Sequence, residues 1–469
     1  MPASAKAAPS LLRWSPDGAD SDFLLQPTEA VLSQSPFLKR QALHLRPDPT
    51  RVIVRPFKPA TEPRDLNPTD KTRANHIVER VLALDPETAD RQLADVLDNF
   101  LGRHRNLLQT FEARAAEMEA ALADHAVFTQ VQRQLVGAYF LNEYSFEASA
   151  LFNPSIVPHP DQSGTPEGSL RFILSLRAVG EGHVSSLTFR SGFIAADGAV
   201  TIDPAARLAS SPDLVGLTSG AGGDDIDVTF AAGQDLSERV IFPVTEAQSN
   251  GIEDARFVQF SSAGQKIYYA TYTAYSGRAI RSELIETSDF VSFRLSTLKG
   301  SAARNKGMAL FPKKIDGRYA MIARQDNENL YLIFSDDLHT WDGGQPILKP
   351  RYPWEFVQIG NCGSPIELDV GWLLLTHGVG PVRKYSIGAA LLDKKDPSKV
   401  LGRLREPLLR PDPSEREGYV PNVVYTCGAM RHRDKIIFPY AISDTFCNFA
   451  TIEIASLIAA MDSSPLEQC

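Results

Sequence analysis

Cysteine and long apolar runs are scarce in this sequence, and basic residues are outnumbered by acidic ones. Only 4 of its 469 residues are cysteine, too few for a disulfide framework, and no CxxC pair suggests a zinc site. Asp and Glu (57) outnumber Lys and Arg (48), which gives a net charge of −9. This acidic balance argues against a nucleic-acid partner held by a basic surface, although a small anion could still bind in a local pocket.

Signals for membranes, secretion and nucleotides are also missing. No stretch approaches the roughly 18 apolar residues of a membrane span, and the N-terminal residues lack the apolar core of a signal peptide. We therefore expect a cytoplasmic protein with no membrane partner. The sequence has no GxxxxGK[ST] loop, no convincing GxGxxG after a strand, no HExxH and no GxSxG, so redox and nucleotide-dependent chemistry find no support.

The first third of the chain divides into three segments that differ in composition and in the spacing of their apolar residues. Residues 1–50 are mixed and rich in proline, so we expect them to be irregular. Residues 51–66 begin with one strand-like run and could supply a first propeller strand. Residues 67–140 have apolar side chains at helical spacing, and the Asp85-Pro86 pair is typical of a helix start. We predict about three helices there.

Residues 141–460 read as short strands separated by Gly, Asp, Asn and Pro. Strand ends that carry an Asp recur with a loose period on the order of 45–50 residues, which is typical of a β-propeller with four strands per blade. The length allows roughly six or seven units, or five blades with long loops. A β-sandwich is the alternative, but it would not explain the repeat.

A propeller binds ligands where the inner strands of its blades converge, so site residues should be scattered along the sequence. Candidates are Asp254 beside Glu253, the basic turn at Arg304, the strand-end Arg324, and His377 after an apolar strand. Each also has an ordinary structural interpretation, such as a turn salt bridge or a buried histidine. Two arginines and a histidine could bind phosphate if they converge, because guanidinium groups bind it through two hydrogen bonds.

Several motifs in fixed order make the chain similar to a known family. The segments are Ala150–Ser155, Gly251–Arg256, Tyr272–Gly277, Ala309–Tyr319, Gly371–Leu373 leading to His377–Val379, and Val420–Val424 leading to Asp444-Thr445. Together they resemble glycoside hydrolase family 130, the inverting β-mannoside phosphorylases and related β-mannosidases. The resemblance implies an all-β fold, a five-bladed β-propeller over residues 141–460, to which this chain adds the helical segment at 67–140 near its N-terminus.

The resemblance also assigns roles. Asp254 matches the catalytic acid, which in that family protonates the glycosidic oxygen through the 3-hydroxyl of the mannosyl unit while phosphate attacks the anomeric carbon. Arg304, Arg324 and His377 match phosphate-binding positions, and Gln358 stands where related phosphorylases have a lysine. The candidate substrate-binding residues are Asn153, Arg190, Asn305, Tyr272 and Asp444.

Departures from the family pattern leave alternatives open. Gln358 removes a positive charge, which should weaken phosphate binding by about 1–3 kcal/mol. Ala255 replaces the proline of the signature, and the loop from Gly360 to Pro365 is more polar than usual. The leading hypothesis is phosphorolysis of a β-mannoside, or the reverse mannosyl transfer.

The first alternative is an inverting β-mannosidase, which needs a second carboxylate such as Glu253, Glu355 or Glu367. The second is a glycan-binding propeller without activity. For the enzyme we expect a β-mannoside oligosaccharide and inorganic phosphate as substrates. We expect no metal, no organic cofactor and no nucleic-acid partner, and the helices could form the interface of a homo-oligomer.

Overall fold

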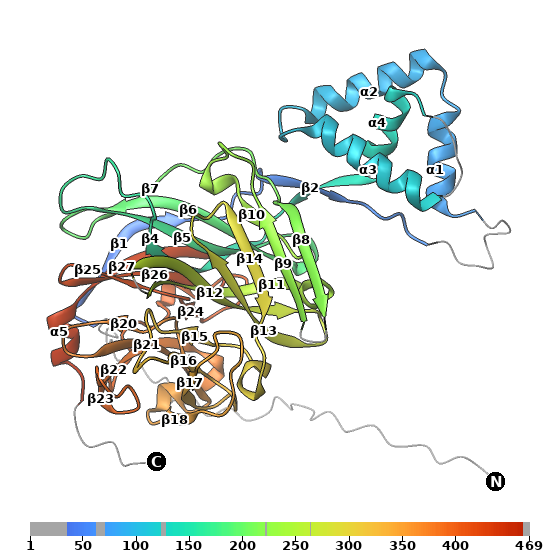
Figure 1. Cartoon of the computed structure of the whole chain (residues 1–469). Coiled ribbons are helices and arrows are strands. Elements are labelled where there is room, and N and C mark those ends of the chain that lie inside the picture. Colours follow the sequence, from blue (N-terminus) through green and yellow to red (C-terminus); the bar gives the residue numbers. More distant parts are fainter. Residues whose placement is uncertain (1–34, 62–70, 123–127, 221–222, 263, 463–469) are drawn as a thin grey trace, which may run out of the picture. The chain divides into compact units, whose positions relative to one another are not determined.

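The computed structural model describes residues 35–61, 71–122, 128–220, 223–262 and 264–462. Strands dominate this part of the chain, as predicted, and α1 to α4 gather in one N-terminal segment (Figure 1). The helices are α1 (Arg73–Leu82), α2 (Pro86–Phe100), α3 (Leu107–Leu122), α4 (Gln130–Tyr139) and, after the last strand, α5 (Ile454–Ala459).

Side-chain caps explain where the N-terminal helices begin. Thr72 caps α1 and Thr129 caps α4, each through a reciprocal pair of hydrogen bonds with the third helical residue. Asp85 caps α2 by accepting from the Thr88 amide, and Pro86 occupies the first helical position. Within the described ranges 71–122 and 128–140 the structure has four helices, where the spacing predicts about three.

A separate two-stranded sheet brackets these helices. β2 (Val52–Pro56) pairs antiparallel with β3 (Leu141–Ser145), so the chain enters and leaves the helical segment through adjacent strands. The prediction that 51–66 supplies a first propeller strand is corrected here, because β2 takes its only described strand partner from the far end of the helical segment. Residues 62–70 lie outside the described part.

The other strands form four larger sheets. The eleven-stranded sheet contains β4 (Ala150–Pro158), β5 (Leu170–Val179), β6 (Ser185–Ile194), β7 (Val200–Ile202), β8 (Asp213–Gly220), β9 (Gly223–Thr229), β10 (Val240–Ile241), β11 (Gly251–Ser262), β12 (Gln265–Tyr275), β13 (Ile280–Thr287) and β14 (Ser292–Thr297). Within it, two antiparallel groups are joined where Gly251 of β11 pairs in parallel with Ser185 of β6.

The remaining sheets are smaller. The four-stranded sheet contains β15 (Ala309–Leu310), β16 (Tyr319–Ala323), β17 (Leu330–Ser335) and β18 (Gln345–Leu348). A five-stranded sheet contains β19 (Gln358–Asn361), β20 (Ile366–Glu367), β21 (Trp372–Val379), β22 (Tyr385–Leu392) and β23 (Val400–Arg403). The last sheet contains β24 (Val424–Tyr425), β25 (Met430–His432), β26 (Lys435–Ile442), β27 (Phe446–Glu453) and β1 (Leu38–Leu45).

The last sheet is completed by a strand from near the start of the chain. β1 pairs antiparallel with β27, with Leu38 opposite Ile452 and Leu45 opposite Cys447. The prediction that residues 1–50 are irregular is therefore corrected for the strand, and residues 1–34 lie outside the described part. The strand is hard to predict from sequence because its side chains alternate only weakly between buried and exposed positions.

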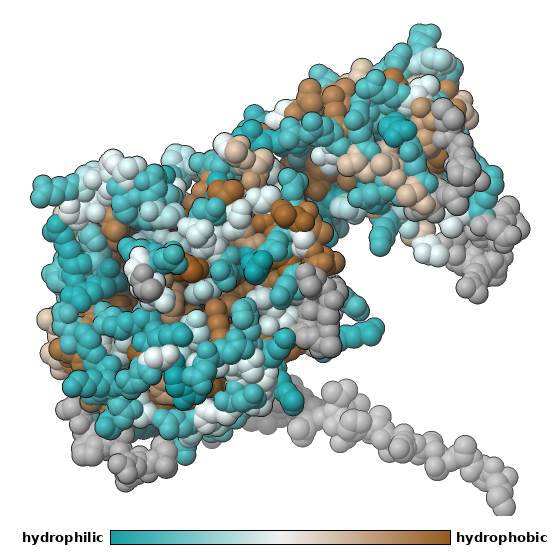
Figure 2. Space-filling model, in the orientation of Figure 1, coloured by the Kyte–Doolittle hydropathy of each residue, from teal (hydrophilic) through white to brown (hydrophobic). Residues whose placement is uncertain are grey.

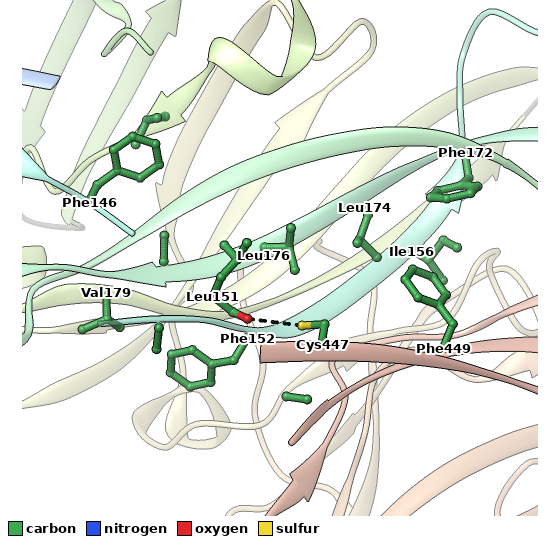
Figure 3. Close-up of a cluster of buried hydrophobic side chains, with 14 of the residues drawn as sticks. Phe146, Leu151, Phe152, Ile156, Phe172, Leu174, Leu176, Val179, Cys447 and Phe449 are labelled. Atoms are coloured by element: carbon green, nitrogen blue, oxygen red, sulfur yellow. Dashed lines mark hydrogen bonds between the residues drawn. The ribbon is translucent and has the colours of Figure 1, made fainter. Parts of the chain in front are cut away.

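Buried aliphatic and aromatic side chains join the first and last sheets. In Figure 3, Leu151 of β4 and Cys447 of β27 approach each other, and the cysteine Sγ donates to the Leu151 carbonyl at 3.4 Å. Phe172 and Phe449 pack across the same boundary, with ring centroids 6.4 Å apart. Removing this apolar surface from water stabilises the packing of β4 against β27.

Two bulges place polar residues inside otherwise apolar strands. The β4–β5 register breaks between Phe152 and Ser155, and the β11–β12 register breaks between Glu253 and Arg256. Asn153 and Asp254, within these breaks, have φ values of 50° and 56°. Asn and Asp tolerate this left-handed backbone better than most residues, and a bulge redirects a side chain, so both strands can turn a polar group out of the core.

The described surface has no signature of a membrane helix. No helix within the described ranges is long and apolar enough to cross a bilayer. On the face shown in Figure 2, hydrophilic residues surround separate hydrophobic patches.

Candidate active site

A cavity of about 210 Å³ collects polar residues from three of the larger sheets and, in the four-stranded sheet, from the loop before β15 and the residue after β16. Its lining comes from strands and turns that are far apart in the sequence. The lining residues are Asn153, Arg177, Glu253, Asp254, Arg256, Lys306, Gly307, Arg324, Gly360, Asn361, His377, Arg383, Tyr385, Val423, Tyr425 and Asp444.

Asp254 is held from one side. Asn153 donates through Nδ2 to its Oδ1 at 2.7 Å, and Arg177 donates to the same oxygen at 3.3 Å. A second nitrogen of Arg177 donates to Glu253 at 2.7 Å. Because both of these hydrogen bonds to Asp254 end on Oδ1, the geometry leaves Oδ2 for a ligand.

The cavity pushes the pKa values of its two aspartates apart. Burial alone would raise the pKa of Asp254, but Arg177, followed by Arg256 and Lys306, outweighs it and holds this pKa below the ordinary value. Burial raises the pKa of Asp444 to about 7, with Arg177 opposing and the Asp254 charge adding to the rise. Two carboxyl groups with separated pKa values are suited to different roles in proton transfer.

His377 is a neutral partner of Arg324. Burial lowers the pKa of His377 well below its ordinary value, and the nearby Arg324 and Arg256 charges lower it further. Nη1 of Arg324 lies 3.3 Å from Nε2 of His377. The neutral ring can accept there from the guanidinium, which places its own proton on Nδ1.

Positive charge exceeds negative charge in the cavity. Arg256, Lys306, Arg324 and Arg383 form no salt bridge with a carboxylate in the described part of the chain. Arg256 instead donates to the Asp254 main-chain oxygen at 3.0 Å and to a tyrosine hydroxyl at 2.8 Å. Arg256 and Arg324 are buried, and buried charges need partners, so this excess suits an anionic ligand even though the whole chain carries −9.

Buried polar atoms without a protein partner also line this cavity. Asn153 Oδ1, Arg256 Nε, Arg324 Nε and both amide atoms of Asn361 have no hydrogen-bond partner among the described residues. Native proteins pair nearly all such groups, because an unmade buried hydrogen bond costs about 1–3 kcal/mol. Their clustering indicates a wall that a polar ligand or solvent completes.

Five of the residues predicted from sequence meet at the cavity. They are Asp254, Arg324, His377, Asn153 and Asp444. Asp444 lies in the β26–β27 turn with φ at 48°, and Arg324 directly follows β16. Their predicted roles stay predictions, but the structure brings these five side chains to one place.

Three predicted residues lie close in sequence to the cavity without lining it. Arg304 is exposed at the end of a short 3₁₀ turn, and the Asn305 amide donates to the Gln325 carbonyl and to Asn327. The chain reaches the cavity only at Lys306. Gln358 pairs with Val379 in the β19–β21 register, two residues before Gly360 and its partner His377.

The other two predicted residues belong to buried networks elsewhere. Arg190 is 2% exposed and donates to Glu147 at 2.7 Å, which fixes it inside the protein rather than at the cavity. Tyr272 is 1% exposed and hydrogen-bonds Gln248 and Glu283. Their substrate-binding assignment is corrected, since protein partners already satisfy both side chains.

Sequence reasoning assigned no role to several lining residues. Arg256 stands within the Gly251–Arg256 signature, Lys306 follows the basic turn, and Asn361 lies in the unusually polar loop after Gly360. Those signals were present, but the excess of unpaired cations appears only when the strands converge. No group of three or more His, Cys, Asp or Glu side chains that could hold a metal occurs within the described ranges.

The fold and cavity define a mostly β protein with a polar cavity in which cations outnumber carboxylates. A sequence profile described as beta-1,4-mannooligosaccharide phosphorylase, the profile of glycoside hydrolase family 130, matches residues 231–463. The chain belongs to glycoside hydrolase family 130. The matched range contains most of the cavity, while Asn153 and Arg177 precede it.

Characterised relatives are phosphorylases. The chain is 36% identical over 227 residues to the 1,2-beta-oligomannan phosphorylase of a Thermoanaerobacter species, covering 47% of this chain and 75% of that one. It is 31% identical over 232 residues to a beta-1,2-mannobiose phosphorylase of Listeria innocua, covering 47% of this chain and 63% of the relative. A solved structure of the Listeria innocua beta-1,2-mannobiose phosphorylase with beta-1,2-mannobiose aligns with a TM-score of 0.49 at 21% identity, over 67% of this chain and 92% of that one.

Proposed function

We propose that this protein catalyses the inverting phosphorolysis of a β-mannoside to α-mannose 1-phosphate, or the reverse mannosyl transfer. The observation that carries the proposal is the group of cations without carboxylate partners, Arg256, Lys306 and Arg324, lining the same cavity as the carboxylate of Asp254. Relatives named as mannoside phosphorylases support it. Phosphate supplies the nucleophile, so one carboxylic acid suffices for the chemistry.

In the proposed reaction, a phosphate oxygen attacks the anomeric carbon as the glycosidic C–O bond breaks. Asp254 gives its proton, through the 3-hydroxyl of the mannosyl unit, to the leaving oxygen. The protons balance because hydrogen phosphate brings one proton. The product phosphomonoester gives up this proton, which protonates the Asp254 carboxylate again. The reverse transfer uses the same groups by microscopic reversibility.

Phosphate binding would also prepare Asp254 to act as an acid. Arg177, Arg256 and Lys306 keep its pKa low in the free cavity. An anion bound beside these cations offsets their charge, so the pKa of Asp254 rises when phosphate arrives. This coupling makes the acid available only in the complex that can react.

Related phosphorylases have a lysine at the position of Gln358, and in this chain Lys306 is the proposed replacement for that lysine. It lines the cavity and its charge lowers the pKa of Asp254, whereas Gln358 lies beyond the lining. With Arg324 and His377 it would form the phosphate-binding group. Arg304, which the resemblance would include, is exposed outside the cavity.

Hydrolysis finds less support in the same cavity. It needs a second carboxylate that activates water. Glu355 is buried against Arg403, and Glu367 pairs with Lys313, so neither lines the cavity. Glu253 does line it, but it is paired with Arg177.

Asp444 is the other carboxyl in this lining, and its pKa of about 7 suits a general base at neutral pH, so it is the one residue of this cavity that would favour the β-mannosidase. A glycan-binding protein without activity would have no use for the acid–phosphate arrangement.

We also propose that the larger sheets form the five blades of a β-propeller. The parallel Gly251–Ser185 contact divides the eleven-stranded sheet into two groups, which with the other three sheets makes five. The turns after β5 and β21 support a structural repeat, because each contains two consecutive residues with φ between 54° and 68°: Gly182 and His183, and Val382 and Arg383.

The test is the product formed from β-1,2- and β-1,4-mannobiose with and without inorganic phosphate. The proposal predicts mannose 1-phosphate that appears only when phosphate is present. Free mannose at the same rate without phosphate would favour the β-mannosidase. No product from either disaccharide, in both directions of the reaction, would favour the glycan-binding protein.

Three further expectations stay predictions of the sequence. They are a cytoplasmic location, a reaction without metal or organic cofactor, and a homo-oligomer that the helical segment could support.

A further inference from the structure

The side chain of Asn361 lacks partners in a place where a buried amide would normally have them. It is 1% exposed and lines the cavity, yet neither Oδ1 nor Nδ2 has a hydrogen-bond partner in the described part of the protein. Its main chain is fixed, because Asn361 ends β19 opposite Thr376 of β21. An amide held in a cavity wall with a free donor and a free acceptor suits a ligand that both accepts and donates.

The neighbours place Asn361 on the anion side of the cavity. A Cβ added at Gly307 would lie 3.8 Å from Arg324 Cβ and 3.8 Å from Asn361 Oδ1, so the two side chains flank this glycine. The preceding residue, Gly360, pairs with His377, whose Nε2 lies 3.3 Å from Arg324. Asp254 has other partners, Asn153 and Arg177.

Phosphate and sulfate differ in one property that an amide can detect. At neutral pH inorganic phosphate keeps at least one P–O–H group, whereas sulfate has none. Arg324 and Lys306 can only donate hydrogen bonds, so they attract both anions without detecting that proton. The Asn361 amide can donate through Nδ2 to one phosphate oxygen and accept through Oδ1 from the P–O–H.

We propose that Asn361 is a specificity-determining residue that makes this site prefer hydrogen phosphate over sulfate. The inference rests on the proposed function, because it takes the anion in the cavity to be phosphate. It also gives a role to the polar loop after Gly360, in a chain where Gln358 has removed a cation. Asn361 accepts a hydrogen bond from the P–O–H group. The proton of this group is the one that later protonates Asp254 again.

The test compares binding of inorganic phosphate and of sulfate by calorimetry at constant ionic strength. The variants are Asn361→Leu, which keeps the shape without polar atoms, and Asn361→Ser, which keeps a smaller donor and acceptor. Asn329→Leu is the matched control, since its amide donates to Asp326 outside the cavity. Arg324→Gln tests the anion site itself.

We expect wild type and Asn329→Leu to prefer phosphate. Asn361→Leu should raise the phosphate Kd about tenfold and the sulfate Kd clearly less, because both anions lose the bond from Nδ2 but only phosphate also loses the bond from its P–O–H to Oδ1. Asn361→Ser should fall between these values, and it keeps the test valid if the leucine variant fails to fold. Arg324→Gln should weaken both anions.

Three results would overturn the inference. One is an unchanged phosphate Kd in both Asn361 variants, which would leave the proposed function standing. Another is an equal loss of phosphate and sulfate in those variants. The third is a change confined to the KM for the mannoside, which would place Asn361 against the sugar. If wild type binds neither anion, the proposed function fails first and this inference fails with it.

Discussion

Two groups of buried arginines in this protein differ in how their charges are satisfied. Arg51 and Arg190, 1% and 2% exposed, both pair with the fully buried Glu147. Arg256 and Arg324, in the cavity, have no carboxylate partner in the described ranges. The first group is complete without a ligand and the second is not. Burial of an arginine therefore does not identify a site, whereas several cations without a counter-charge lining one cavity do.

The largest effect should follow from removing the acid in the incomplete group. We expect Asp254→Asn to lower kcat for phosphorolysis about 10²–10⁴-fold, the usual contribution of a general acid. The phosphate Kd should change little, because Arg324 and His377 remain. Steady-state kinetics with Asp336→Asn as an exposed control would check this. A variant that keeps a tenth or more of the wild-type kcat would refute the assignment.

The complete group should affect stability instead of activity. Glu147→Gln leaves two buried arginines without their counter-charge, and breaking such a pair costs about 3–5 kcal/mol. Denaturant unfolding would measure the loss, with the exposed Glu246→Gln as control. Where the variant is folded, its kcat/KM should match wild type. A loss of kcat/KM without a loss of stability would place Glu147 and Arg190 in the site after all.

The phosphate side should show the contrast between a lining arginine and an exposed one. Arg324→Gln removes a charge-assisted contact and should raise the KM for phosphate about ten- to a hundredfold. Arg304→Gln, on an exposed turn, should change it by about threefold or less, in line with the small worth of exposed charges. Equal effects from the two variants would mean that the turn at Arg304 closes over the cavity when substrate binds.

The smallest predicted effect is a pH-dependent change in stability at Asp444. Its folded-state pKa is about 7, above that of an unfolded aspartate, so the folded protein holds a proton that the unfolded chain releases between about pH 4 and 7. Wild-type stability should therefore fall over that window relative to Asp444→Asn.

The two proteins should differ least near pH 4 and most above pH 7, by about 1 kcal/mol or more. Denaturant unfolding at several pH values would measure this. Parallel curves for the two proteins would contradict the assigned pKa.

The part of the site that sequence could predict depends on local backbone chemistry. Asn153 and Asp254 lie in strand bulges with left-handed backbones, and each precedes a short residue, Pro154 or Ala255. Such polar residues interrupt an apolar strand and so stand out in the sequence. The strands after residue 141 could also be predicted, because apolar and polar residues alternate where one face of a strand is buried.

The rest depended on partners distant in the chain. Arg190 resembles a site residue until Glu147, 43 residues away, is seen to satisfy it. Tyr272 is occupied by Glu283 in the same way. Arg304 matches the family pattern but Lys306 lines the cavity, because the turn decides which of these two neighbouring cations faces inward. No local pattern contains that information.

The most direct test of the central claim is which oxygen reaches the anomeric carbon. Phosphate labelled with ¹⁸O on all oxygens would be incubated with the protein and a β-mannobiose, and the products weighed by mass spectrometry. If phosphate bound in the cationic cavity is the nucleophile, the product is mannose 1-phosphate that keeps every labelled oxygen. Unlabelled free mannose as the main product, with the labelled phosphate unconsumed, would contradict the account.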